Sequence, residues 1–153
     1  NVPNTCRYNT TASHGKLNRG GIITLNISGE YEFYFIYCFI NSSFAYWWWR
    51  IFDGGITYRA NLLKDLPLPY NLVSDYEKEE FKKIAIEMIN KEKDYVSTKM
   101  NAGAKQENIK FPKEYRELIN NKIFQLLGTT GQTSSVFNKI HANNFFGESR
   151  RNE

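Results

Sequence analysis

The first regular pattern along the chain is an alternation of apolar and polar residues over residues 22–27. Ile23, Leu25 and Ile27 fall on one face of an extended segment, and the residues between them are polar. A period of two residues is typical of a β-strand that buries one face. We therefore expect a strand here, after a polar loop over residues 1–20.

Residues 31–52 are the densest apolar stretch, and only Glu32 and Arg50 are charged within it. We expect one buried, aromatic-rich helix. A helix that is apolar on all sides must be covered all round, so either this domain wraps it completely or one face packs against a neighbour. The polar residues 41–43 interrupt the stretch, and a membrane span needs about 20 apolar residues, so we expect no membrane partner.

Short connecting elements follow this stretch. The pattern predicts a turn at Asp53-Gly54-Gly55, a short strand or extended loop over residues 56–60, a brief helical turn over residues 61–65 and an extended segment over residues 66–69, where each proline disfavours the helical conformation of its predecessor.

The second half of the chain has a helical period. Ser74 and Glu77 match the S-x-x-E pattern of a capping box. Apolar residues then recur at spacings of three and four, with Lys and Glu between them, which predicts one amphipathic helix over residues 74–100. Residues 101–110 are expected to form a polar loop.

Proline and glycine frame a further helix. Pro112 is expected to open it and Gly128 to end it, because proline fits a helix start and glycine a helix end. Residues 129–153 are polar and weakly patterned. They are interpreted as a tail with a short helix around residues 134–142.

Together these patterns predict an α/β fold of the α+β type. A small sheet that includes residues 22–27, with residues 56–60 as a candidate second strand, is packed by the aromatic-rich helix and two further amphipathic helices. Residues 1–128 would form one domain with a helical part at about 74–128, followed by the polar tail 129–153.

The composition is that of a globular protein with a mild positive charge. The chain has 153 residues, of which 41% are hydrophobic and 24% charged, and its net charge is +4. That balance permits an anionic partner without requiring one. Two cysteines, Cys6 and Cys38, have no metal-binding spacing and are too few for a disulfide framework. We interpret them as free thiols in a reducing cytoplasm.

The sequence contains no complete catalytic or cofactor motif. No glycine-rich dinucleotide or phosphate loop follows a strand, and no serine lies in a nucleophile-elbow context. His14 and His141 are far apart in polar stretches. We therefore expect that this chain alone is not an enzyme and binds neither metal nor cofactor.

The chemistry that remains is that of binding. Arg50 ends the aromatic stretch, Tyr58 and Arg59 follow the turn, and Lys64 comes five residues later. Arginine reads guanine edges, and both cations bind phosphates. A structural interpretation stands beside this one, because an Arg at a helix C-terminus also complements the helix dipole. The tryptophans at 47–49 are expected to belong to the core.

One block of sequence resembles a known family. It reads INSSFAYWWWRIFDGG over residues 40–55, TYR over residues 57–59 and LKDLPLP over residues 63–69. The block resembles a recurring segment of bacterial DNA methyltransferases, in which an Asn-Ser-Ser-aromatic helix ends near an Arg, a Gly/Asp turn follows, and the exit ends in Pro-(Ile/Leu)-Pro. The similarity is to the C-terminal specificity segment of adenine-specific enzymes of type II and combined restriction–modification systems, including the TaqI-like group. It extends loosely over residues 20–128.

The resemblance implies a DNA target-recognition module separated from its catalytic domain. In that family the catalytic domain binds S-adenosylmethionine and carries an Asn/Asp-Pro-Pro-Tyr/Phe motif, which this chain lacks. The resemblance implies double-stranded DNA as one partner, and a methyltransferase domain packed on residues 31–52 as another. Loops 7–19 and 53–64 would meet DNA, first through Arg50, Tyr58, Arg59 and Lys64, and then through Lys16 and Arg19.

The main alternative is a protein-interaction domain. In that case the chain docks through its aromatic helix and has no direct role with nucleic acid.

Overall fold

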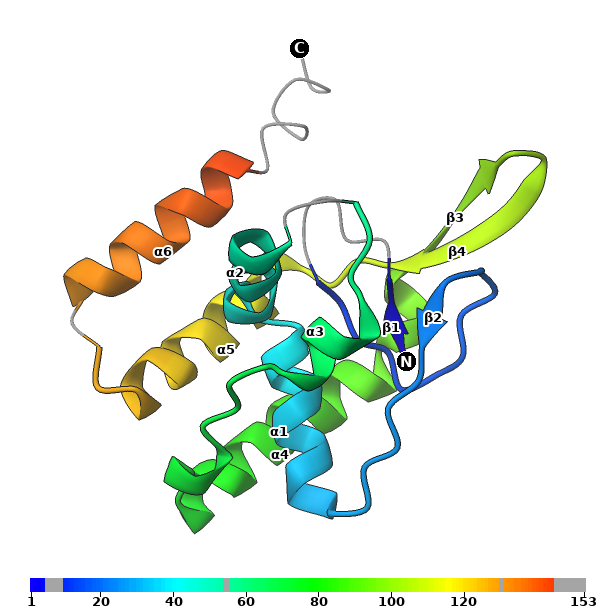
Figure 1. Cartoon of the computed structure of the whole chain (residues 1–153). Coiled ribbons are helices and arrows are strands. Elements are labelled where there is room, and N and C mark those ends of the chain that lie inside the picture. The colour runs from blue at the N-terminus through cyan, green and yellow to red at the C-terminus, as the bar shows by residue number, and fades with distance from the viewer. Residues whose placement is uncertain (5–9, 54–55, 130, 145–153) are drawn as a thin grey trace.

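The strands lie at one side of a group of helices in the computed structural model, which describes residues 1–4, 10–53, 56–129 and 131–144 (Figure 1). The α+β class is confirmed. Within those residues the helices are α1 (Glu30–Ile40), α2 (Ser43–Phe52), α3 (Ala60–Lys64), α4 (Asp75–Asn90), α5 (Lys113–Leu126) and α6 (Gly131–Asn144), with 3-10 turns η1 (Tyr70–Leu72) and η2 (Glu92–Tyr95). Antiparallel strands pair as β1 (Val2–Pro3) with β2 (Ile22–Ile23) and β3 (Val96–Asn101) with β4 (Ala104–Ile109).

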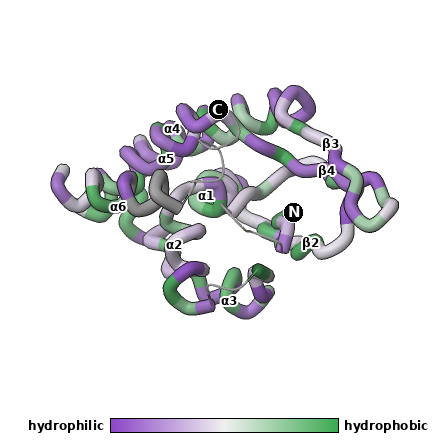
Figure 2. Tube along the Cα trace, turned by 90° about the horizontal axis from the view of Figure 1, so that it is seen from above, coloured by the Kyte–Doolittle hydropathy of each residue, from purple (hydrophilic) through white to green (hydrophobic). Residues whose placement is uncertain are grey.

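Helix α1 lies at the centre of the molecule. Figure 2 shows it in the middle, with the largely hydrophilic α4 and α5 to one side. Phe35 of α1 packs edge-on against Phe81 of α4, with ring centroids 5.0 Å apart, and both side chains are buried. Helix α4 begins with the predicted capping box, in which Ser74 and Glu77 exchange hydrogen bonds. Its apolar stripe therefore faces α1 while its charged residues face solvent.

The single helix expected over residues 31–52 is wrong, because the chain turns at Asn41 and Ser42. The Asn41 side chain accepts a hydrogen bond from the Ala12 N–H (3.0 Å) and donates one to the Ala12 carbonyl (3.2 Å). Ser42 is the N-cap of α2 and its Oγ accepts the Phe44 N–H. The polar residues thus end one helix and start the next. Among the described residues, no helix combines the length and apolar character that crossing a bilayer requires.

The helix expected over residues 74–100 is also wrong in its second half. It ends at Asn90, and residues 96–101 and 104–109 form the β3–β4 hairpin, part of which was expected to be a polar loop. The turn residues Ala102 (φ 48°) and Gly103 (φ 79°) both have positive φ, the pattern of a type I′ hairpin turn. The apolar residues by which α4 packs on the core end with Met88 and Ile89, so burial of apolar surface does not favour a longer helix.

The strand expected over residues 22–27 is shorter than predicted. Only Ile22 and Ile23 pair with β1, although residues 23–27 keep the alternation of half-buried and exposed side chains. Residues 56–59 form an extended loop, in which the Tyr58 N–H donates to the Asn4 carbonyl beside β1. The helical turn expected next is confirmed as α3.

The C-terminal helices follow the sequence pattern more closely. Helix α5 starts after Pro112, and Gly128 follows it with φ of 61°. The helix expected within the tail is confirmed as α6, which is longer than predicted. Its Phe137 ring lies 5.0 Å from that of Phe44 and 4.7 Å from that of Trp47, so α6 packs against α2.

Burial of Cys38 leads to a prediction about alkaline pH. Its Sγ donates to the Phe81 carbonyl, and burial raises the pKa of this thiol. A thiol in the unfolded chain has a pKa of about 8.5, so above that pH the unfolded state loses a proton that the native state keeps. The stabilisation is complete below that pH and falls by about 1.4 kcal/mol per pH unit above it.

We expect Cys38→Ala to remove this part of the pH dependence. Urea unfolding of both proteins between about pH 8 and pH 11 measures it. Other titrating groups are common to the two proteins, so equal slopes would contradict the prediction. Cys6 lies outside the described residues.

Candidate nucleic-acid interface

A row of extended segments connects the two predicted DNA-contacting loops through backbone hydrogen bonds. The Glu107 N–H of β4 donates to the Asn18 carbonyl (2.9 Å), and the Asn4 N–H donates to the Gly21 carbonyl (2.7 Å). On its other side, the Asn4 carbonyl accepts the Tyr58 N–H (2.5 Å). We call this row the extended layer; it consists of β3, β4, residues 18–23, β1 with Asn4, and residues 57–58. In Figure 1, β2, β1 and the segment leading into α3 lie side by side.

Gly21 allows these segments to approach closely. Its φ is +69°, and a Cβ at this position would overlap the Oδ1 atom of Asn4. Glycine adopts positive φ without steric cost. The sequence therefore needs a glycine where the layer passes from the loop to β2.

The loop that carries Lys16 and Arg19 lies along β4. The Arg19 guanidinium donates to Asn108 Oδ1, and burial lowers the pKa of Arg19, although an arginine stays charged in proteins. Lys16 is exposed. The start of the loop is held by Glu92, whose carboxylate accepts the His14 N–H (2.5 Å) and the Gly15 N–H (2.8 Å).

A second cationic group lies at the ends of α2 and α3. Arg50, in the last turn of α2, is exposed, and its guanidinium carbon lies 5.6 Å from the centre of the Trp49 ring. Arg59 is exposed and forms an ion pair with Asp53 at 2.8 Å. Lys64, in the last turn of α3, is exposed as well. The structure thus presents the predicted arginines and lysine to solvent.

Tyr58 is a correction to the predicted site. Its side chain is 1% exposed and its ring lies 6.5 Å from that of Trp49, which is itself buried. A side chain in this position belongs to the core and cannot stack on a base without unfolding its surroundings. The expectation that the tryptophans are scaffold is confirmed for Trp49, while Trp47 and Trp48 are half-buried.

Residues 31–52 were expected to present an apolar surface to a neighbouring domain. In the structure, exposed large apolar side chains of this segment lie only at its C-terminal end. Helix α1 packs against α4 and α5 of this chain, so these two helices cover its apolar surface. The end of α2 differs, since Ile51 is 53% exposed, Phe52 56% and nearby Ile56 68%. We call these three residues the α2-end apolar group. Exposed apolar groups of this kind often mark a contact with another molecule.

The predicted residues therefore fall into two areas. Lys16 and Arg19 lie beside β4, and Arg50, Arg59 and Lys64 lie around α2 and α3; the extended layer connects the areas through Asn4. Arg7, and Gly54 and Gly55 of the predicted turn, lie outside the described residues.

Sequence reasoning missed Glu92 and the polar residues of the β3–β4 hairpin. Glu92 is buried and also accepts a hydrogen bond from the Tyr37 hydroxyl (2.9 Å). In the sequence it stands within a run of charged residues, where a solvent-exposed side chain is the usual outcome. Its partners lie 55 to 78 residues away, so the sequence gives no local sign of its burial.

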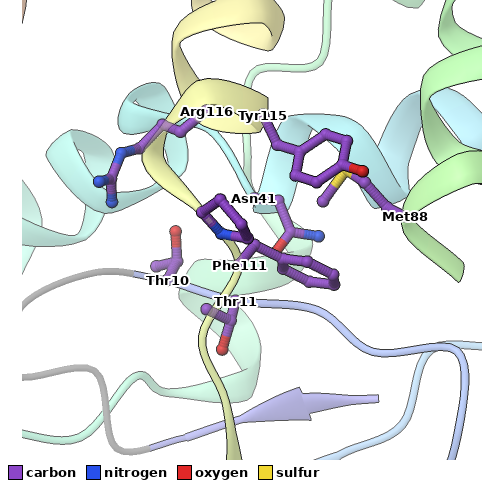
Figure 3. A pocket seen from close by; sticks show the side chains of 8 residues that line it. Thr10, Thr11, Asn41, Met88, Phe111, Tyr115 and Arg116 are labelled. Atoms are coloured by element: carbon purple, nitrogen blue, oxygen red, sulfur yellow. The ribbon is translucent and has the colours of Figure 1, made fainter. Parts of the chain in front are cut away.

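The described residues enclose a small cavity at the junction of the N-terminal segment, α1, α4 and α5. Figure 3 shows Thr10, Asn41 and Tyr115 among the side chains that line it. Its volume of about 10 Å³ has room for about one water molecule. Sites for small organic ligands have about 300–1,000 Å³. This cavity is a packing feature of the junction. The described residues also contain no cluster of three or more His, Cys, Asp or Glu able to hold a metal ion.

Comparison of the chain with protein-family models, with curated proteins and with solved structures finds no match. The resemblance to a methyltransferase specificity segment therefore stays a prediction from the sequence.

Proposed function

We propose that this chain is a DNA target-recognition module that acts in the cytoplasm with an S-adenosylmethionine-dependent, adenine-specific methyltransferase domain. One structural observation supports this proposal most. The extended layer connects two loops that the sequence assigns to DNA contact, although they are about 40 residues apart in the chain. Arg19 lies on this layer, Lys16 and Arg59 lie next to its segments in the chain, and Arg50 and Lys64 lie on the adjoining helices α2 and α3.

The charges around this framework suit a polyanion. Arg50, Arg59 and Lys64 are exposed, and Arg59 forms an ion pair with Asp53. The Arg59–Asp53 pair is exposed, and such pairs are worth at most about 1 kcal/mol. The guanidinium can therefore exchange Asp53 for a phosphate oxygen at little cost, and phosphate contacts provide most of the affinity of such modules.

Catalysis belongs to the partner domain in this proposal. That domain supplies the cofactor and the reacting groups, and this chain positions the DNA. The α2-end apolar group is the surface on which the methyltransferase domain would pack. Among the described residues from 31 to 56, its members Ile51, Phe52 and Ile56 are the large apolar side chains that are exposed. The same group supports the alternative function, a protein-interaction domain with no DNA contact.

We expect Arg59→Ala and Arg50→Ala each to weaken binding to all duplex sequences and to lower the salt dependence of binding. Each lost phosphate contact should reduce the slope of log affinity against log salt by about one. The measurement is fluorescence anisotropy with a labelled duplex of about 30 base pairs, between about 50 and 200 mM salt. Lys83→Ala on α4 removes the same charge from an exposed position and should leave both quantities unchanged.

Two results would contradict the proposal. One is wild-type chain that binds no duplex at protein concentrations up to about 100 µM, the weak end of non-specific DNA affinity. The other is equal effects of Lys83→Ala and the two arginine variants. Salt-insensitive binding to the methyltransferase domain, lost in Ile51→Ser, together with no DNA binding, would favour the alternative function.

A further inference from the structure

The β3–β4 hairpin is a two-stranded ribbon that extends away from the helices (Figure 1). Residues 97–101 of β3 are exposed, as are Ala104 and Lys105 of β4. Only the base of the ribbon enters the core, through buried Ile109 and its partner Val96. Two-stranded ribbons are marginally stable on their own, and burial of a core cannot explain the residues beyond the base. Glu107 and Asn108 bond to Asn18 and Arg19 of this chain, whereas the exposed side chains nearer the turn are available for contact with another molecule.

The strand register separates the ribbon side chains into two faces. Directly paired residues share a face, and faces alternate along each strand. The first face, which we call the amide face, carries Ser97, Lys99, Asn101, Ala104, Gln106 and Asn108. The second face carries Val96, Thr98, Met100, Lys105, Glu107 and Ile109.

The amide face differs from the second face in its chemistry. It consists of one hydroxyl, one lysine, three side-chain amides and Ala104, and these six described residues include no carboxylate. The acidic side chain of the ribbon, Glu107, lies on the second face, where its Oε2 accepts the Asn18 N–H at 2.7 Å. At the base of the amide face, Arg19 donates to Asn108 Oδ1. The face thus carries two cations and several donors and acceptors.

Asn101, Gln106 and Ser97 of this face form bonds that a ligand can replace, whereas the Asn108 amide is held by Arg19. Asn101 Nδ2 donates to Gln106 Oε1 at 3.3 Å, and the Ser97 hydroxyl donates to the Asn108 carbonyl at 3.4 Å. Both bonds are long and exposed, so a ligand can replace them at little cost. The tight turn at Ala102 and Gly103 fixes the two strands in register.

From this arrangement we propose that the β3–β4 ribbon enters the major groove of duplex DNA and reads base edges with its amide face. The inference rests on the proposed function and names the element that gives it sequence specificity. The major groove admits a two-stranded ribbon, side-chain amides bond both N6 and N7 of adenine, and Lys and Arg bond guanine. A strand of six residues spans about 20 Å, enough to cross several base pairs. Arg50, Arg59 and Lys64 then hold phosphates beside the groove.

The test is selection from a duplex library with a randomised centre, using the full chain, followed by affinity measurements on the selected duplex. We expect wild type to enrich a motif. Gln106→Ala and Asn101→Ala should each lower affinity for that motif by about 5- to 150-fold, the discrimination expected for one bidentate amide contact. Binding to unrelated duplex should change less than about twofold, because phosphate contacts remain. Thr98→Ala, on the second face, is the matched control and should bind the motif as wild type does.

A second variant distinguishes a loss of base recognition from a loss of stability. Gln106→Glu keeps the size of the side chain and adds a carboxylate to the amide face, so it should abolish selection of the motif while the thermal unfolding temperature stays that of wild type.

The outcomes distinguish the two proposals. A wild-type chain that binds no duplex overturns the proposed function. A motif that Gln106→Ala, Asn101→Ala and Gln106→Glu all bind as wild type does overturns the ribbon proposal and leaves the proposed function standing. Sequence-independent binding by wild type, a preference for RNA hairpins, or equal losses in Thr98→Ala and Gln106→Ala overturns the ribbon proposal as well.

Discussion

Trp49→Ala should lower the free energy of unfolding by about 3–5 kcal/mol, the range for removal of a buried aromatic ring. Trp49 is fully buried and its ring lies 5.6 Å from that of Tyr46 and 6.5 Å from that of Tyr58. Its Nε1–H donates to the Thr57 carbonyl at 3.4 Å. The substitution therefore opens a cavity where α2 meets the loop that leads into α3, and it removes a bond that holds that loop.

Urea unfolding followed by far-ultraviolet circular dichroism measures this effect. Ile51→Ala, two residues along the same helix and 53% exposed, is the matched control, and exposed positions change stability within about 0.5 kcal/mol. Similar losses in the two variants would contradict the assignment of Trp49 to the core. A stable Trp49→Ala protein with weakened DNA binding would instead indicate that this ring stacks on a base.

Local patterns predicted α3, the start of α4 and the span of α5, because their determinants lie within a few residues. The capping box at Ser74 and the glycine after α5 are examples. The break between α1 and α2 depends on a distant contact instead. The Asn41 side chain satisfies both backbone groups of Ala12, 29 residues away. The sequence showed polar residues in an apolar stretch, but it did not show which backbone they would bond.

The β3–β4 hairpin was missed because its signals are weak. Its turn has Ala102 before Gly103, where Asn-Gly or Asp-Gly would be the stronger indication. Its strands carry polar and charged side chains that also suit a solvated helix end, so the period of α4 was extended through them. Burial against this chain reaches mainly the base of the ribbon, at Ile109 and Val96, so the strands carry no apolar alternation that would have indicated them.

The candidate site was predicted in part. Exposure of Arg50, Arg59 and Lys64 follows from charge alone. The burial of Tyr58 does not, because it depends on β1, whose Asn4 carbonyl accepts the Tyr58 N–H. Similarly, Arg19 lies on the ribbon because of Asn108, 89 residues away.

Glu92→Gln should lower the free energy of unfolding by about 2–3 kcal/mol, because a buried donor without an acceptor costs about 1–3 kcal/mol. Both carboxylate oxygens of Glu92 accept hydrogen bonds, from the N–H groups of His14 and Gly15 and from the Tyr37 hydroxyl. An amide in the same place can accept with its oxygen only, and its NH₂ group faces a donor. At least one backbone N–H of the loop therefore loses its partner.

The stability loss should come with weaker DNA binding, because the loop that Glu92 holds continues into Lys16 and Arg19. Glu117→Gln removes a carboxylate from an exposed ion pair with Lys113 and should cost less than about 0.5 kcal/mol. Tyr37→Phe removes one donor and should cost about 1 kcal/mol while leaving the loop bound. Urea unfolding and duplex anisotropy on the three variants separate the roles. If Glu92→Gln is destabilised but binds duplex as wild type does, Glu92 stabilises the fold only and the loop contributes nothing to DNA contact.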